Sequence, residues 1–337
     1  MDILLDINSA KTTPDSARFD QLLSSALIHH KTGQICEAQA LYNKLLENFP
    51  NDAQILHLSG LAALQLDQYS KSIELISKAI DLKTDFAEAY NNRGNAYRGS
   101  LKFKEAAADY STAISLSPDY AMAHNNLAIT LRDLGKLDES LAEHNTALSL
   151  KPDYPEALSK RGTLLIEFEK FEEALRDFDH ALFLNPDELD ILHNRGIALT
   201  KTGRLDQALS DYNRLLKHEP SNKSAYNNRG TILLELDLSH EALLDFSKAL
   251  ELDPDYAEAL NHRGVAFKEL KRFGEALEDY NKALTLKPDY ADALNNRGVV
   301  YREFGRLTEA LADYSKAIEL VPDYAEVFNN RGTILKD

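Results

Sequence analysis

Cysteine is almost missing from this sequence. Cys36 is the only one in 337 residues, which excludes an internal disulfide framework, and no spacing of Cys and His resembles a zinc site. Long apolar runs are missing too, so no membrane insertion is expected. The start of the chain lacks the basic segment and apolar run of a secretory signal. These absences predict a protein of a reducing compartment, the cytoplasm, that binds no metal.

Positive charge is also in deficit. The chain has 38 Lys and Arg against 54 Asp and Glu, a formal net charge of -16. Proteins that bind nucleic acids gain affinity by neutralising phosphates with basic side chains. The composition therefore predicts no nucleic-acid partner and no anionic membrane surface as a target.

One tetrapeptide, Asn-Asn-Arg-Gly, recurs at residues 91–94, 227–230, 295–298 and 329–332. The glycines of these copies are separated by multiples of 34 residues, which is a repeat length. If Phe19 is position 1, tandem repeats begin at residues 19, 53, 87, 121, 155, 189, 223, 257 and 291. Residues 325–337 begin a tenth repeat, and residues 1–18 form a leader that we expect to be flexible.

Two stretches of each repeat carry apolar residues at helical spacing, which predicts a helix hairpin. Position 8 is mostly glycine, and position 20 is always Ala or Ser, so we expect these small residues to let the two helices approach closely. Glycine at position 15, as in Gly135, predicts a left-handed end to the first helix. Proline at position 32 ends the second helix. The following aspartate is expected to cap the next helix, as Asp255 with Glu258.

The repeat resembles the tetratricopeptide repeat (TPR). Residues 87–120 match that pattern at Tyr90, Gly94, Tyr97, Ala106, Tyr110, Ala113 and Pro118. The resemblance implies an all-α fold: one right-handed TPR superhelix, an α-solenoid of nine 34-residue repeats plus one extra helix, over residues 19–337. Ala26 in place of glycine and Thr84 in place of proline depart from the pattern near the N-terminus.

Position 7 carries arginine in six repeats, and each of these repeats also carries aspartate at position 23. The two positions can lie opposite each other in a hairpin, and a planar guanidinium suits a carboxylate. The predicted structural pairs are Arg93 with Asp109, Arg161 with Asp177, Arg195 with Asp211, Arg229 with Asp245, Arg263 with Asp279, and Arg297 with Asp313. Arg331 has no position 23 to meet. A row of arginines for an acidic ligand is the alternative.

Position 6 is usually asparagine, a poor helix former, so its recurrence needs a cause. The resemblance implies that first helices line a concave groove, and that an asparagine ladder, as in the TPR superhelix of O-linked N-acetylglucosamine transferases, contacts the backbone of an extended ligand. The expected groove residues at position 6 are Asn92, Asn126, Lys160, Asn194, Asn228, His262, Asn296 and Asn330, with basic residues at position 12, Arg98, Arg132, Lys268 and Arg302. The alternative is that these asparagines bond to the neighbouring helix.

No enzyme motif remains after the repeat is subtracted. Of the 14 glycines only Gly99 and Gly274 lie outside positions 8 and 15, so no phosphate-binding loop is available. We expect no catalytic residue, no cofactor and no metal, and a scaffold that binds a protein or peptide segment in its groove. The alternatives are the substrate-recognition arm of a larger O-linked glycosyltransferase and a structural solenoid that self-assembles.

The last residues repeat the first helix without a second one. Phe328, Ile334 and Leu335 should then lack their usual cover. This pattern predicts either that the chain is part of a longer polypeptide or that two copies meet through the C-terminal helix.

Overall fold

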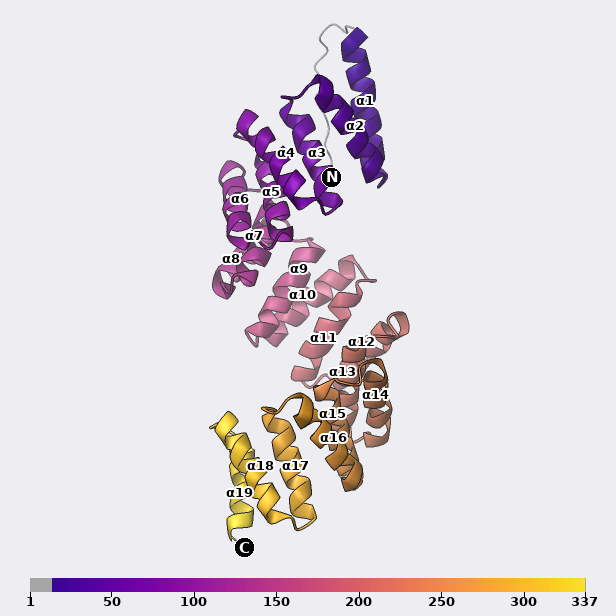
Figure 1. The fold of residues 1–337 in the computed structure, drawn as a ribbon, viewed down its shortest axis with the longest axis vertical. Coiled ribbons are helices and arrows are strands. Elements are labelled where there is room, and N and C mark those ends of the chain that lie inside the picture. The colour runs from indigo at the N-terminus through magenta and orange to yellow at the C-terminus, as the bar shows by residue number, and fades with distance from the viewer. Residues whose placement is uncertain (1–13, 337) are drawn as a thin grey trace. The chain divides into compact units, whose positions relative to one another are not determined.

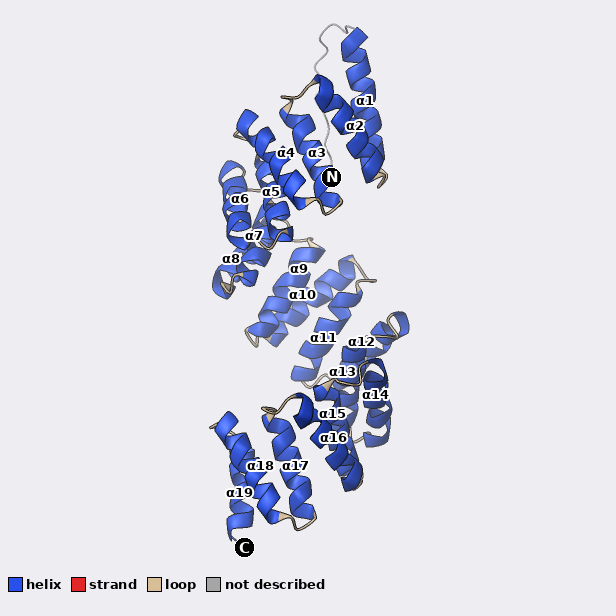
Figure 2. Cartoon of the chain, viewed as in Figure 1, coloured by secondary structure: helices blue, strands red, loops and turns tan. Residues whose placement is uncertain are grey.

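The structure is a computed structural model that describes residues 14–336, and these residues are helical with no strand among them (Figure 2). The helices are α1 (Pro14–Lys31), α2 (Ile35–Asn48), α3 (Ala53–Gln65), α4 (Tyr69–Leu82), α5 (Ala87–Gly99), α6 (Phe103–Leu116), α7 (Ala121–Asp133), α8 (Leu137–Leu150), α9 (Pro155–Glu167), α10 (Phe171–Leu184), α11 (Leu189–Lys201), α12 (Leu205–His218), α13 (Lys223–Glu235), α14 (Ser239–Leu252), α15 (Ala257–Glu269), α16 (Phe273–Leu286), α17 (Ala291–Glu303), α18 (Leu307–Leu320) and α19 (Ala325–Lys336).

Helix boundaries follow the 34-residue period. From α3 onward, each first helix begins at position 1 of its repeat and each second helix begins at position 17. Consecutive pairs such as α3 with α4 and α5 with α6 pack as hairpins (Figure 1). Helix α1 begins at Pro14, so it includes residues 14–18 of the expected leader; residues 1–13 lie outside the described residues.

The chain divides into two compact units, unit 1 (Met1–Leu164) and unit 2 (Leu165–Asp337), and the boundary falls inside α9. Within each unit, second helices also pack on the first helix of the next repeat, as α4 on α5 in unit 1 and α16 on α17 in unit 2. Each unit is thus a stack of helix hairpins, the arrangement of an α-solenoid. That residues 19–337 form one continuous domain stays a prediction.

The close approach between paired helices involves position 24, which corrects the expectation that position 20 is the partner of the glycine. A Cβ added at Gly264 would lie 2.5 Å from the Tyr280 ring, and one at Gly94 would lie 2.7 Å from the Tyr110 ring. Alanines at position 20, such as Ala276, are fully buried but are not the nearest neighbours. Ring-to-backbone packing is what offsets the low helix propensity of glycine.

Left-handed turns end the first helices, as the glycines at position 15 predict. Gly33, Gly135, Gly203 and Gly305 have φ between 70° and 80°. The same position adopts the same conformation where glycine is absent: φ is 55° to 60° at Asp67, Leu101, Glu169, Asp237 and Lys271. The turn is therefore imposed by hairpin packing in these repeats, although a side chain disfavours it.

The predicted capping box at Asp255 is wrong. The N-cap of α15 is Tyr256, at position 34, and its side chain makes no capping bond. The tyrosines at this position are half-buried against the core, so aspartate at position 33 lies one residue too early to cap. Asp and Asn at position 34 do cap: Asp52 accepts from the amides of Gln54 and Ile55, and Asn222 accepts from that of Ala225. Glu188 at the same position makes no capping bond.

Candidate functional site

Arginines at position 7 bind the aspartate at position 23 of the same hairpin through two parallel bonds. In each pair Nε donates to Oδ2 at 2.7 to 2.8 Å and Nη2 donates to Oδ1 at 2.6 to 2.8 Å. The pairs are Arg93 with Asp109, Arg195 with Asp211, Arg229 with Asp245, Arg263 with Asp279, and Arg297 with Asp313. Arg161 and Asp177 lie in different units, so their pairing stays a prediction.

A third bond of these arginines crosses between repeats, and the sequence reasoning missed it. Nη1 of Arg229 donates to Asn213 Oδ1 at 2.7 Å, and Nη1 of Arg297 donates to Asn281 Oδ1 at 2.8 Å. The acceptor is position 25 of the preceding repeat, and Ser77 is the equivalent acceptor for Arg93 at 3.1 Å. One guanidinium thus joins three helices. The recurrence of Ser, Asn or Asp at position 25 was the available signal.

The environment of these arginines fixes their charge. The hydrogen bonds that Arg195 and Arg229 donate to Asp211 and Asp245 raise the pKa of each guanidinium above the ordinary value, against the opposing effect of burial. Three of the five N–H donors of Arg195 and of Arg229 are bonded to side chains inside the stack, which favours the structural pair over a row that faces an acidic ligand. The structural role of the arginines stays a prediction.

The asparagines at position 6 form hydrogen bonds with the neighbouring first helix. Five of the side chains at position 6, four asparagines and His262, donate to position 5 of the preceding repeat, so a rung joins residues 35 apart. The rungs are Asn126 Nδ2 to Asn91 Oδ1 at 2.9 Å, Asn296 Nδ2 to Asn261 Oδ1 at 3.0 Å, Asn330 Nδ2 to Asn295 Oδ1 at 2.9 Å, His262 Nδ1 to Asn227 Oδ1 at 2.9 Å, and Asn92 Nδ2 to His57 Nε2 at 2.8 Å.

Three positions of the ladder remain. Asn228 Nδ2 instead donates to the hydroxyl of Tyr212 at 3.2 Å, and Lys160 is exposed. Asn194 is half-buried on α11. The ladder is therefore first a bond between repeats, which was the alternative reading of the sequence. A rung uses only one N–H of each primary amide, so hydrogen-bonding capacity remains.

A cleft of about 760 Å³ opens on the first-helix face of unit 1. It is lined by Leu64, Asp67, Tyr69, Asn95, Arg98, Gly99, Leu101, Phe103, Met122, Asn126, Ile129, Asp133, Tyr154 and Glu156. Arg98 and Asn126 were expected in a groove. Met122 at position 2 and Asn95 and Ile129 at position 9 also line the cleft and were missed.

The other expected basic groove residues lie on their helices as follows. Arg132, Lys268 and Arg302 are half-buried, and Nη2 of Arg302 lies 3.7 Å from Oε1 of Glu303.

In the described part of the chain, no three His, Cys, Asp or Glu side chains gather as a metal site would require. None of the helices in that part has the length and apolar character needed to cross a membrane.

Family models of the tetratricopeptide repeat match residues 23–85, 87–120, 109–142, 159–222 and 193–257, and TPR repeat models match residues 128–167, 266–305 and 300–337. The chain belongs to the tetratricopeptide repeat family. TPR folds are typically non-catalytic scaffolds for interactions between proteins.

Solved TPR structures are similar to the chain. A thermophilic TPR protein of Thermus thermophilus is 24% identical, with a TM-score of 0.48, over 55% of this chain and 100% of its own. A TPR protein of Parabacteroides merdae is 20% identical, with a TM-score of 0.47, over 87% of this chain and 98% of its own. A comparison with curated proteins found no match.

Proposed function

We propose that this TPR protein is a non-enzymatic scaffold that binds an extended segment of a partner protein in the cleft of unit 1. The observation that carries the proposal is the lining of that cleft, which comes mainly from the first-helix positions 2, 6, 9, 12 and 13. The recurrence of these positions places side chains from equivalent points of successive helices along one cleft, which suits a ligand that runs across them.

The cleft offers both apolar and polar contacts to such a ligand. Met122 and Leu101 are 46% and 75% exposed, although both are apolar. Beside them, Asn95 and Asn126 present amides that can both donate to and accept from a peptide backbone. Apolar side chains with a few polar groups are the usual composition of a ligand site.

Charge in the cleft restricts the partner. The carboxylates of Asp67, Asp133 and Glu156 line it, with Arg98 as the basic residue, and the whole chain carries a formal charge of -16. Complementarity of charge therefore favours neutral or basic segments over acidic ones.

The ladder prepares the first helices for this role. Asn126 is bonded to Asn91 and is 9% exposed, so its rotamer is set before any ligand arrives. A side chain that is already ordered loses less conformational entropy on binding. In this proposal the ladder fixes the spacing of the helices, and the exposed neighbours of Asn126 supply most of the contact.

Selection from a random peptide library displayed on phage tests the proposal. Clones that bind the chain are then measured against Met122→Lys and against Leu116→Lys, a matched control on α6 outside the cleft. We expect Met122→Lys to weaken binding about tenfold or more, because a charge replaces a buried apolar contact. Selected peptides that bind both variants equally would reject the cleft. The two alternatives, a glycosyltransferase arm and a self-assembling solenoid, remain predictions.

A further inference from the structure

Three residues of this chain depart from its own repeat pattern, and all three line the cleft of unit 1. They are Gly99 at position 13, Leu101 at position 15 and Met122 at position 2. The other repeats carry charged residues or glutamine at position 13, glycine or charged residues at position 15, and polar residues at position 2. Departures that gather at one place indicate a function there, because the fold of the repeat does not need them.

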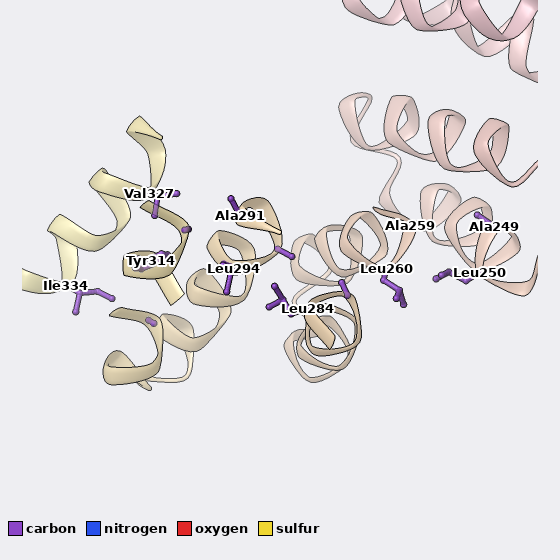
Figure 3. Packing of buried hydrophobic residues seen from close by; sticks show 14 residues of the cluster. Ala249, Leu250, Ala259, Leu260, Leu284, Ala291, Leu294, Tyr314, Val327 and Ile334 are labelled. Atoms are coloured by element: carbon purple, nitrogen blue, oxygen red, sulfur yellow. The ribbon is translucent and has the colours of Figure 1, made fainter. Parts of the chain in front are cut away.

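Leu101 combines two features that oppose the stability of the free chain. Its φ is 59°, in the left-handed region that disfavours residues with a side chain, and it is 75% exposed. In unit 2, by contrast, Leu260, Leu284 and Leu294 lie buried in one cluster between helices (Figure 3). Neither the turn nor the packing of the free chain therefore explains a leucine at this position.

Gly99 makes room for an aromatic ring at the cleft. A Cβ on Gly99 would overlap the ring of Tyr69, so glycine lets this ring rest on the backbone of α5. The Tyr69 hydroxyl donates to Oδ1 of Asp67 at 2.7 Å, and both residues line the cleft. The cleft thus brings together a positioned aromatic ring, Leu101 and the exposed side chain of Met122.

Carboxylates line the same cleft as these apolar side chains. Asp133 and Glu156 are exposed, and within residues 14–336 neither forms an ion pair. Arg98 is the basic residue of the lining, against three acidic ones. The excess of negative charge attracts a basic side chain of a ligand. It opposes an anionic membrane and a second copy of this chain, whose formal charge is -16.

We propose that Leu101 is the anchor residue of the cleft. The partner segment packs one large apolar side chain against Leu101, Met122 and the Tyr69 ring, with Lys or Arg beside it for the carboxylates. This inference rests on the proposed function, because it names the ligand of the same cleft. Leu101 leaves water only in the complex, so the same residue lowers the stability of the free chain and raises the affinity for the partner.

Leu101→Gly tests the anchor, because it should move stability and binding in opposite directions. Glycine adopts the left-handed turn without strain, so the midpoint of urea unfolding should rise. Peptides selected from the phage library are synthesised, labelled and titrated with the whole chain. Their affinity should fall about tenfold or more, because an apolar contact is lost.

Other variants separate the side chain from the turn. Lys271→Gly, at the equivalent turn of unit 2, is the matched control: its midpoint should also rise, while peptide binding stays unchanged. Leu101→Asn keeps a side chain that tolerates the left-handed turn and should lose binding as Leu101→Gly does. Leu101→Met should retain most of the affinity, because an apolar side chain of similar size remains.

The selected peptides supply the other half of the test. We expect them to share a Leu, Ile, Met or Phe close to a Lys or Arg. Replacing that apolar residue with alanine should weaken binding to the unchanged chain about tenfold or more, but have little further effect on Leu101→Gly, because the two side chains contact each other. Replacing the basic residue with glutamine should remove most of the salt dependence of binding.

Two outcomes would overturn the anchor and leave the cleft intact. One is a set of peptides that lose affinity for Met122→Lys but bind Leu101→Gly as they bind the unchanged chain. The other is an alanine replacement in the peptide that weakens binding equally in both proteins. Peptides that also ignore Met122→Lys, or a selection that yields none, would reject the cleft and the anchor together. Self-association abolished by Leu101→Asn would overturn the proposal too, because a second copy would then be the occupant.

Discussion

Single atoms set the distance between paired helices in this protein. At position 8, the missing side chain of glycine is usually where an aromatic ring of the partner helix rests, and six glycines have a neighbour that a Cβ would approach within 2.8 Å. Gly332 differs from these six, with the same sequence context and no ring above it. A substitution at Gly264 therefore changes both the packing against a ring and the helix propensity, whereas one at Gly332 changes the helix propensity alone.

We predict opposite signs for alanine at these two glycines. Gly264→Ala is expected to lower the free energy of unfolding by about 1 to 3 kcal/mol, because its methyl group would overlap the Tyr280 ring. Gly332→Ala is expected to raise it by up to about 1 kcal/mol through helix propensity alone. Urea unfolding of the two variants checks both values, and destabilisation by Gly332→Ala would contradict the account.

The turn at position 15 allows a stabilising substitution. Lys271 has φ of 60°, a conformation that costs a residue with a side chain about 1 to 2 kcal/mol. Part of the gain from glycine is offset by the greater entropy of its unfolded chain. Lys271→Gly should therefore raise the free energy of unfolding by roughly 0.5 to 1 kcal/mol. Gly305→Lys, at a turn with φ of 70°, should lower it, which thermal unfolding can measure.

His57 makes one rung of the ladder sensitive to acid. Burial lowers its pKa to about 4, below the unfolded value of about 6.5. Between these values the unfolded chain binds more protons, so the stability present above pH 6.5 falls as pH decreases towards 4, by about 1.4 kcal/mol per unit.

His57→Asn should remove this contribution and keep the rung. Asn92 would then donate to an amide oxygen, as Asn126 donates to Asn91. Comparing urea unfolding at pH 7.5 and 4.5, we expect the variant to lose on the order of 2 kcal/mol less than the unchanged chain. An equal loss in both proteins would show that His57 is not the titrating group.

At the level of the helix hairpin, the arginine and aspartate pairs are the main polar connection. The side chains of Arg263 and Asp279 are 24% and 8% exposed, so removing one partner leaves a poorly hydrated charge. The repeat at 53–86 shows another solution at the same two positions, Ser59 and Leu75. The same two residues, serine at position 7 and leucine at position 23, can therefore replace Arg263 and Asp279 together as a double variant.

Asp279→Leu alone is expected to lower the free energy of unfolding by about 2 to 3 kcal/mol, less than for a fully buried pair because Arg263 reaches some water. Arg263→Ser together with Asp279→Leu should recover about half of that loss or more, since no charge is left without a partner. Measured by urea unfolding, a double variant no more stable than Asp279→Leu would mean that the pair acts through contacts other than its charge.

Hairpins and their boundaries could be predicted from the sequence because the period fixes them. Repeats counted from Phe19 place the start of α5 at Ala87 and of α15 at Ala257, where the structure has them. The same reasoning found which arginine faces which aspartate, because both vary together within a repeat.

Contacts between repeats were harder to predict, because the comparison of residue types was made between positions of the same repeat. The bond from Arg229 to Asn213 and the rung from Asn126 to Asn91 each join two repeats. Their geometry depends on how far one hairpin is rotated on the next, which the spacing of residues does not give. The misplaced cap at Asp255 has a similar cause, since burial of Tyr256 decides where α15 begins.

For the whole molecule, stability should be a sum of neighbouring contributions. Second helices pack on their own first helix and on the next one, as α14 does on α13 and α15. In such a protein a destabilising substitution lowers the stability of its own repeat and of the adjacent repeats. This differs from a globular domain, where unfolding is cooperative throughout.

Hydrogen exchange of Gly264→Ala tests this property. We expect faster exchange in α15 and α16 and, to a smaller degree, in α14 and α17, because these helices share contacts with the altered hairpin. Amides of α3 and α4 should exchange as in the unchanged chain. Uniformly faster exchange in all helices would instead indicate a single cooperative unit.

The asparagine ladder also bears on how such a chain grows in evolution. Each rung takes position 6 from one repeat and position 5 from the one before, as Asn330 and Asn295 do. A tandem duplication of one 34-residue segment copies both position 5 and position 6. The duplicated repeat therefore has a donor for one neighbouring repeat and an acceptor for the other once it folds. Loss of one segment likewise leaves its two neighbours able to join. Chains of different length can then arise by whole-segment gain or loss without any compensating substitution.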